Sequence, residues 1–209
     1  MLQEMPKEAN IIVVGAGLSG LELVSELLKC GIPNVVLLES GSYDRIAHTN
    51  SYLTPRESFT FWQSPELDPD FYQPWRSDST PHYCGLSGLR RGIGGRSRYW
   101  RGITLRMDDW ALEDPIWPVG IRHDLERSWK GNIGLYEEVE KDLACWARRD
   151  LSAFRGIEEK ILVDFLSHTL DSPCLPVPLA RQYSLTKTGK KWCAYTPISR
   201  WMEFGGNLE

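Results

Sequence analysis

Residues 11–40 read IIVVGAGLSGLELVSELLKCGIPNVVLLES, and the prediction of the fold starts from them. The first four residues, Ile11–Val14, are apolar and β-branched, which is typical of a strand fully buried in a parallel sheet. Apolar side chains then recur at helical spacing until Gly31 and Pro33, and a second apolar run follows at residues 35–38. This order predicts a strand, a glycine-rich turn, a helix and a second strand.

The turn carries three glycines, Gly15, Gly17 and Gly20, in the G-x-G-x-x-G spacing of dinucleotide-binding proteins. In that motif the first glycine permits a sharp turn, the second lets the backbone approach a pyrophosphate, and the third lets the helix pack closely on the strand. Unpaired N–H groups at the start of the helix would face the phosphates, and the helix dipole favours negative charge there. The spacing predicts a nucleotide site, and an ordinary βαβ turn is the alternative.

An acidic residue closes this unit. Glu39 stands nineteen residues after Gly20, close to the distance expected of a residue that hydrogen-bonds a ribose hydroxyl. A carboxylate at this point disfavours a ribose 2′-phosphate, so FAD or NAD is expected rather than NADP. The residues predicted to hold the adenosine end of the cofactor are Gly15, Ala16, Gly17, Leu18, Ser19, Gly20, Glu39 and Ser40.

The composition is that of an ordinary globular protein, with 209 residues and 42% hydrophobic side chains. A net charge of −4 gives no reason to expect nucleic acid or an anionic membrane as a partner. The amino-terminal residues are polar and the first apolar run is far shorter than the ~18 residues of a spanning helix, so a cytoplasmic protein is expected. Five cysteines without a C-x-x-C spacing are interpreted as reduced thiols.

Beyond Ser40 the regular pattern stops. Residues 41–81 mix five prolines with aromatic residues and show no sustained period, which indicates either a functional loop or an excursion that only packs. A glycine- and arginine-rich segment follows at residues 85–106, GLSGLRRGIGGRSRYWRGITLR. Six arginines and no acidic residue lie between Ser79 and Met107, which in an acidic chain indicates an anion site, a partner surface or a solvated loop.

Two helices are expected after Asp108. The apolar positions that predict the first are Tyr136, Val139, Leu143 and Trp146, and those that predict the second are Ile157, Ile161, Phe165 and Leu166. Residues 172–191 are proline-rich and then basic, and we interpret them as an excursion or a partner-facing loop.

The βαβ unit, RGIGGRSRYWRG at residues 91–102 and LRMDDW at residues 105–110 together resemble the glucose–methanol–choline (GMC) family of FAD-dependent oxidoreductases. The resemblance is nearer to the branch that contains pyranose oxidases and gluconate or fructose dehydrogenases. A Trp-Pro pair at residues 117–118 and LYEEVEKDL at residues 135–143 extend it. The fold class that it implies is α/β: an incomplete Rossmann-like FAD-binding domain with long irregular excursions and accessory helices.

The resemblance covers roughly residues 8–145 and implies that residues 1–209 form one partial FAD-binding domain. Its expected parts are a βαβ unit that binds ADP at residues 8–40, an excursion with a second FAD-contacting loop at 41–107, and a helical and loop segment at 108–209. The substrate domain of the family is expected to be absent from this chain.

The family's second FAD-contacting loop passes the pyrophosphate and the flavin, and it matches Gly94, Gly95 and Ser97. Some relatives carry a histidine joined covalently to the flavin where this chain has Tyr99 before Trp100, so the resemblance implies noncovalent FAD. The cofactor contacts that it implies here are Gly94, Gly95, Arg96, Ser97 and Trp100, with Arg96 standing where many members have a small residue.

A flavin enzyme that oxidises an alcohol needs a base for the hydroxyl proton while hydride passes to the flavin. In the GMC family this base is a histidine, helped by a second histidine or an asparagine, in the carboxy-terminal part, which is expected to lie outside this chain. No catalytic residue and no metal site is predicted here, because the four histidines are scattered: His48, His82, His123 and His168.

The resemblance therefore implies the FAD-binding half of an oxidoreductase acting on CH–OH groups of an alcohol or sugar-like substrate. We expect it to be inactive alone and to work in a heteromeric complex, with a second polypeptide that supplies the rest of the FAD domain, the substrate domain and the catalytic histidine. Two alternatives stay open. One is a non-catalytic nucleotide-binding or regulatory module derived from such an enzyme, and the other, ranked last, is a small NAD-dependent dehydrogenase acting alone.

Overall fold

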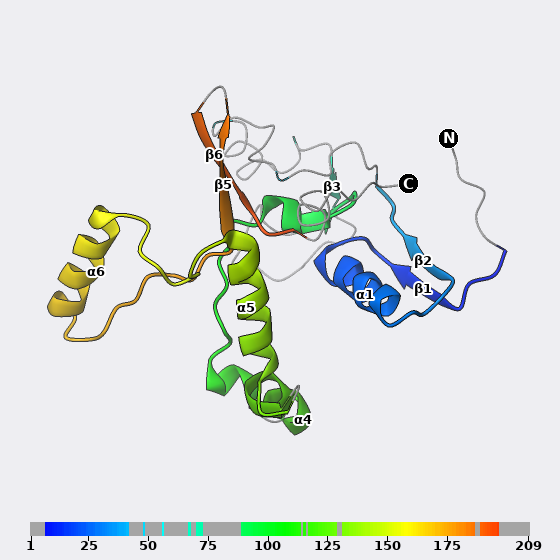
Figure 1. Ribbon diagram of the computed structural model, residues 1–209, viewed down its shortest axis with the longest axis horizontal. Helices are drawn as coiled ribbons and strands as arrows, with labels where there is room; N and C mark the ends of the chain where they lie inside the picture. Colours follow the sequence, from blue (N-terminus) through cyan, green and yellow to red (C-terminus); the bar gives the residue numbers. More distant parts are fainter. Residues whose placement is uncertain are drawn as a thin grey trace, which may run out of the picture. The chain divides into compact units, whose positions relative to one another are not determined.

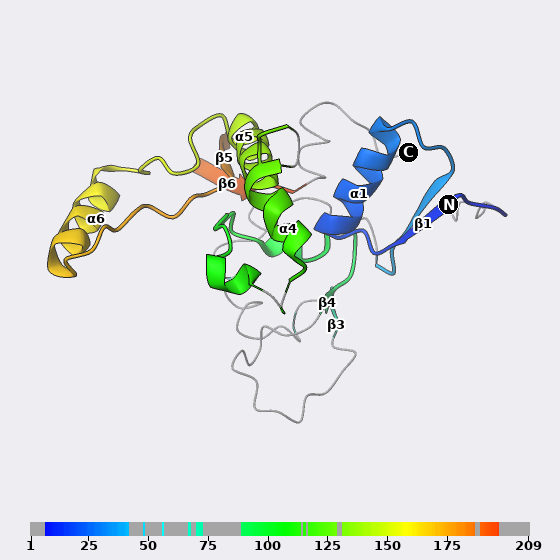
Figure 2. The same cartoon turned by 90° about the horizontal axis from the view of Figure 1, so that it is seen from below.

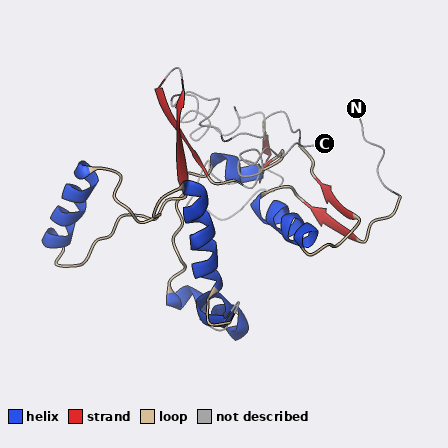
Figure 3. Ribbon diagram, viewed as in Figure 1, coloured by secondary structure: helices blue, strands red, loops and turns tan. Residues whose placement is uncertain are grey.

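The computed structural model describes residues 7–41, 48, 56, 67, 70–72, 89–113, 115, 117–128, 131–186 and 189–196. The chain separates into two compact units, Met1–Trp100 with Leu185–Glu209, and Arg101–Ser184. Helices and strands both occur (Figure 3), and the fold is mixed α/β with a small parallel sheet. Most of the excursion predicted at residues 41–81 and the histidine at position 82 lie outside the described residues.

The first unit begins with the predicted order of strand, helix and strand: β1 (Ile11–Val14), α1 (Leu18–Lys29) and β2 (Val35–Leu38). The two strands pair in parallel, each residue of β1 opposite the corresponding residue of β2. Figure 1 shows α1 beside this pair of strands. The helix stops where Gly31 adopts a positive φ of 72° and donates its N–H to the carbonyl of Leu28 at 3.0 Å, as expected of a glycine at a helix end.

The two faces of β1 differ in burial. Val13 is 8% exposed and faces α1, because a Cβ built on Gly20 of the helix would stand 3.5 Å from Val13 Cγ1. On the opposite face Ile12 is 59% exposed and Val14 is 82% exposed. The prediction of a fully buried strand is therefore wrong for β1, since only the face toward α1 is packed.

A short antiparallel pair of strands includes the first described residues of the glycine- and arginine-rich segment. β3 (Phe71–Tyr72) pairs with β4 (Leu89–Arg90), and Figure 2 shows the two side by side. The guanidinium group of Arg90 lies over the ring of Phe71, 4.6 Å from its centroid, which is a cation–π contact. The 3₁₀ helix η2 (Gly95–Tyr99) follows, so the predicted cofactor loop is in part a tight helical turn.

The second unit is mainly helical, and both helices predicted after Asp108 are present. Its elements are η3 (Asp109–Leu112), α4 (Val119–His123), the π-helical turn η4 (Asp124–Ser128), α5 (Leu135–Ala147) and α6 (Ile157–Thr169). Leu143 and Trp146 of α5 are buried, as are Leu112, Leu151 and Leu179 from the segments around it. This cluster is the core of the unit.

The helix α6 differs from α5 in that none of its residues is buried. Its apolar residues Ile157, Ile161 and Phe165 are each more than half exposed. Figures 1 and 2 show a loop leading into α6 and a second loop leading out of it. The apolar pattern therefore predicted the helix correctly, but this unit does not bury its apolar side.

The interpretation of residues 172–191 as a loop is wrong over its second half. β5 (Arg181–Thr186) and β6 (Gly189–Ala194) form a two-stranded sheet. The prolines end at Pro178, and the residues that follow include tyrosine, leucine and threonine, which suit a strand. Beyond β6 the hydroxyl of buried Tyr195 donates a hydrogen bond to Glu22 Oε1 of α1.

Candidate nucleotide-binding site

The glycine turn between β1 and α1 has the geometry that its sequence predicts. Gly15 has a φ of +96°, which other residues rarely adopt, and its N–H donates to the carbonyl of Leu38 at 2.7 Å. A Cβ built on Gly20 would stand 2.0 Å from the carbonyl oxygen of Gly15, so this glycine permits the close approach of helix and turn. A Cβ built on Gly17 would meet no atom within 4 Å. The turn therefore requires glycine at Gly15 for its backbone angle and at Gly20 for close packing, and it leaves open space beside Gly17.

The amino-terminal end of α1 is open to an anion. Gly17 precedes the helix in an extended conformation, and neither a side-chain cap nor an acidic residue occupies the first turn. The first N–H groups of a helix have no partner within it and carry the positive end of its dipole. Leu18 and Ser19, which begin the helix, are exposed, whereas Ala16 is buried in the turn.

The carboxylate of Glu39 joins three backbone segments. Its Oε2 accepts the N–H of Ala16 at 2.9 Å, and its Oε1 accepts the N–H groups of Gly41 and Gly92, each at 2.9 Å. The exposed Ser40 adds a long hydroxyl contact of 3.4 Å to Oε1. Partial burial raises the pKa of Glu39, but hydrogen bonds from the N–H groups of these neighbours outweigh it and lower the pKa overall.

The structure places the second predicted loop against the glycine turn. The N–H of Gly94 donates to the carbonyl of Ala16 at 2.7 Å, and Gly17 and Gly94 form an isolated parallel bridge. A Cβ built on Gly95 would stand 3.3 Å from the Cα of Gly17. Two segments far apart in the sequence thus meet at the open part of the turn.

The remaining residues predicted at this loop differ in exposure. Ser97 is buried and its hydroxyl donates to the carbonyl of Gly94 at 2.6 Å, so it closes the loop on itself. Arg96 is exposed. Trp100 is half-buried, and its carbonyl lies 2.7 Å from Nε2 of His48. Ser97 and Trp100 are therefore tied into the loop, and Arg96 stands on its surface.

A buried ion pair at this loop was not predicted from the sequence. Arg98 is 1% exposed, and its Nη2 lies 3.0 Å from Asp70 Oδ2 and 2.9 Å from the carbonyl oxygen of Arg91. The excess of arginines between Ser79 and Met107 was a signal of unusual chemistry. The excess of arginines could not show which of them is buried, because Asp70, the acidic partner of Arg98, lies outside the stretch from Ser79 to Met107.

His48, the one histidine of the first unit among the described residues, is 2% exposed. In addition to its contact with the carbonyl of Trp100, its ring lies 5.3 Å from that of Trp192. His123 and His168 are on exposed helix ends of the second unit. Across the part of the chain that the structure describes, no group of three or more histidine, cysteine or acidic side chains could hold a metal ion.

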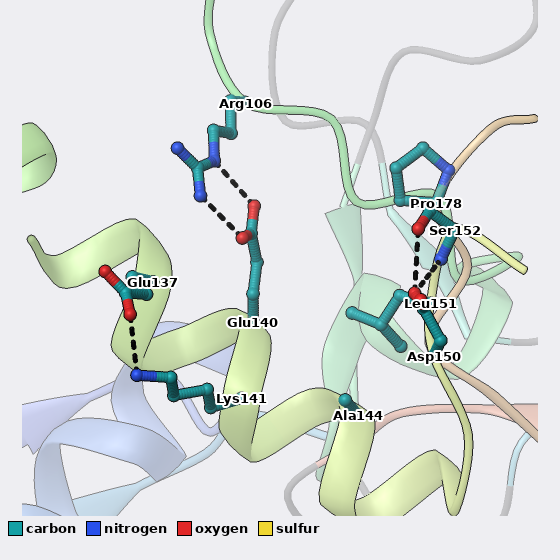
Figure 4. A pocket seen from close by; sticks show the side chains of 9 residues that line it. All are labelled: Arg106, Glu137, Glu140, Lys141, Ala144, Asp150, Leu151, Ser152 and Pro178. Atoms are coloured by element: carbon teal, nitrogen blue, oxygen red, sulfur yellow. Dashed lines mark hydrogen bonds and ion pairs between the residues drawn. The ribbon is translucent and has the colours of Figure 1, made fainter. Parts of the chain in front are cut away.

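A cleft of about 380 Å³ lies in the second unit, lined by Arg106, Glu137, Glu140, Lys141, Ala144, Asp150, Leu151, Ser152 and Pro178 (Figure 4). Four of its charged groups form two ion pairs. Glu140 accepts both Nε and Nη2 of Arg106 at 2.7 and 2.6 Å, and Glu137 accepts Lys141 Nζ at 2.6 Å. Asp150 accepts the N–H and the hydroxyl of Ser152. These contacts are typical of paired side chains on a surface and not of a catalytic acid–base pair.

One further spacing bears on the dehydrogenase alternative. Tyr183 and Lys187 have the Y-x-x-x-K spacing of small NAD-dependent dehydrogenases. Tyr183 lies on the strand β5, and position 187 is outside the described residues.

No protein-family model matches the chain, and no curated protein is significantly similar to it. Among the residues that the structure describes, no helix is long and apolar enough to cross a membrane.

Proposed function

We propose that the chain is the FAD-binding half of an oxidoreductase that acts on CH–OH groups of an alcohol or sugar-like substrate, on an incomplete Rossmann-like domain. One observation carries the proposal: the glycine turn meets the Gly94–Gly95 segment at the uncapped amino-terminal end of α1. In dinucleotide-binding folds the pyrophosphate is held at this end of the first helix.

The residues present fit such a cofactor. Gly15 and Gly17 leave open space where a Cβ would otherwise project, so a pyrophosphate can approach the backbone closely. Oε2 of Glu39 accepts the N–H of Ala16, and since a carboxylate oxygen has two lone pairs it can also accept a ribose hydroxyl. The turn and Glu39 would hold the adenosine half, and Gly94, Gly95 and the exposed Arg96 would border the flavin half.

FAD, when bound, supplies the group that takes hydride from the carbon bearing the hydroxyl. The part of this chain is to bind and orient it, without a covalent bond, since Tyr99 stands where some relatives of the proposed family carry the linking histidine. The flavin end would lie beside a loop in which the Ser97 hydroxyl and Nη2 of Arg98 are hydrogen-bonded within the protein. Such a loop is already organised before the cofactor binds.

A second polypeptide is proposed to supply the rest of the FAD domain, the substrate domain and the catalytic histidine. The uncovered face of β1 supports this, because Ile12 and Val14 expose apolar surface that parallel sheets normally bury. The exposed apolar residues of α6 support it in the same way. Among the described residues, Cys30, Cys145 and Cys174 are free thiols, which is consistent with a complex that works in the cytoplasm.

Binding of the cofactor is tested by calorimetric titration of the purified chain with FAD, NAD and NADP. We expect FAD to bind and NADP to bind least, because the Glu39 carboxylate disfavours a 2′-phosphate. Gly17→Trp should abolish FAD binding, since the indole would fill the open turn. Gly120→Trp is the matched control, because Gly120 lies in α4 of the other unit and is likewise free of neighbours within 4 Å. Equal FAD affinity in both variants and the unaltered chain would overturn the proposal.

The catalytic part is tested by co-expression with the polypeptide encoded beside this gene. A copurifying complex with flavin absorbance that reduces an artificial electron acceptor with alcohols or sugars supports the oxidoreductase. A chain that binds FAD but forms no such complex, or a complex whose activity survives Gly17→Trp, favours the non-catalytic nucleotide-binding module instead.

A further inference from the structure

The buried ion pair between Arg98 and Asp70 spans the second cofactor loop. Arg98 is 1% exposed and Asp70 15% exposed, and Nη2 of the arginine lies 3.0 Å from Oδ2 of the aspartate. The carbonyl of Asp70 also accepts the N–H of Arg91 at 2.8 Å, and the carbonyl of Arg91 accepts Nη2 of Arg98 at 2.9 Å. Asp70 therefore contacts both Arg91, which precedes the Gly92–Ser97 segment, and Arg98, which follows it.

The stem of Arg98 also packs against the glycine that meets the turn. A Cβ built on Gly94, whose φ is +90°, would stand 2.9 Å from Cγ and 3.4 Å from Cδ of Arg98. The N–H of Gly94 donates to the carbonyl of Ala16. A continuous path of contacts thus leads from Asp70, through the arginine side chain, to the backbone of the glycine turn.

We propose that Asp70 and Arg98 are positioning residues that hold the Gly94–Gly95 segment in place for the part of the dinucleotide beyond the pyrophosphate. The inference rests on the proposed function, in which that segment borders the flavin half of FAD. Removing one partner of a buried pair leaves an uncompensated charge that must move toward water. Arg98 would then withdraw from beneath Gly94, and the loop would lose its fixed distance from the turn.

The test compares FAD with ADP, because ADP needs only the glycine turn and Glu39, whereas FAD needs both loops. In Asp70→Asn we expect FAD affinity to fall about tenfold while ADP affinity changes by less than about twofold. The spectrum of bound flavin should shift toward that of free FAD. Asp70→Glu and Arg98→Lys keep the charge and should recover part of the FAD affinity, although lysine lacks the planar fork of arginine.

Glu140→Gln is the matched control, since it breaks the exposed pair between Glu140 and Arg106 in the other unit and should leave both affinities unchanged. A cooperative thermal transition shows that each variant folds. Parallel losses of FAD and ADP affinity in folded Asp70→Asn would overturn the inference, as would unchanged FAD affinity.

Amide hydrogen exchange of a peptide covering residues 92–100 separates this inference from the proposed function. If the unaltered chain binds no FAD, the proposed function fails. The positioning role then still stands if exchange in this peptide rises in Asp70→Asn and not in Glu140→Gln. Unchanged exchange in Asp70→Asn overturns the positioning role, whether or not the chain binds FAD.

Discussion

Gly17 and Gly20 are three residues apart, yet a methyl group at each would meet very different surroundings. At Gly20 an added Cβ stands 2.0 Å from a backbone oxygen, and at Gly17 it meets nothing within 4 Å. We expect Gly20→Ala to lower the free energy of unfolding by about 3 kcal/mol, because the backbone must move. Gly17→Ala should cost less than about 1 kcal/mol but weaken ADP binding about tenfold, since the methyl group occupies the approach of the pyrophosphate.

Urea unfolding and calorimetric titration with ADP measure these two effects. Gly120→Ala serves as the control for a glycine with open surroundings outside the site: it should leave ADP affinity unchanged and alter the free energy of unfolding by no more than the ~1 kcal/mol of helix propensity. Gly17→Ala with unaltered ADP affinity would contradict a role for this residue in binding.

Glu39 is the second residue whose contacts make a sharp prediction. Its carboxylate accepts N–H groups from Ala16, Gly41 and Gly92, and an amide cannot replace both oxygens as an acceptor. We expect Glu39→Gln to lower the free energy of unfolding by about 2–3 kcal/mol, the usual worth of hydrogen bonds to a charged group. Glu26→Gln, which breaks an exposed pair with Lys29, should have little effect.

The pH dependence gives an independent check on Glu39. Because its pKa is lowered in the folded protein, its contribution to stability is present above the usual glutamate pKa of about 4.3 and is lost as pH falls through the lower folded value. The stability of Glu39→Gln should therefore fall less steeply than that of the unaltered protein in acid. Parallel curves from pH 6 to pH 3 would show that this carboxylate is not linked to folding.

Among the elements, the start of α6 is held by a charge pair with a measurable signature. The side chain and the N–H of Arg155 both donate to Glu159, and they lower the pKa of Glu159 to about 2. The contribution of this pair to stability is present above about pH 4.3 and is lost as pH falls through about 2. In Arg155→Gln the pKa of Glu159 should rise toward its usual value and stay below it, because the N–H remains.

The carboxyl carbon shift of Glu159, followed by NMR against pH, measures that pKa. Lys160→Gln removes a neighbouring pair with Asp164 on the same helix and should leave the pKa of Glu159 unchanged. A value that stays near 2 in Arg155→Gln would show that the guanidinium group is not its cause.

At the scale of the whole molecule, the two faces of the parallel sheet should respond differently to the same substitution. Val13→Ala should lower the free energy of unfolding by about 2 kcal/mol, because it removes packed methyl groups. Val14→Ala, at a residue 82% exposed, should change it by less than about 0.5 kcal/mol. Thermal or urea unfolding of the isolated chain measures both. A large loss in Val14→Ala would mean that this face is already covered, and would remove the support it gives to a second polypeptide.

The strand–helix–strand part of the first unit could be predicted from local sequence. The bounds of the first strand, the helix and the second strand follow from apolar runs, helical spacing and glycine, all of which act within a few residues. The roles of Gly15 and Gly20 follow in the same way, because a positive φ and a close backbone approach are local demands. The strands after Pro178 were missed because the prolines before them dominated the pattern.

Local sequence by itself determined that this chain would build a glycine turn between a parallel strand and a helix, followed by an acidic residue. Only the tertiary structure decided what surrounds that turn: the bridge from Gly17 to Gly94, the N–H donors to Glu39, and the burial of Arg98 against Asp70. The physical reason is the range of the interactions. Propensity and periodicity act between near neighbours, whereas the choice of a buried partner depends on packing between segments that the sequence keeps far apart.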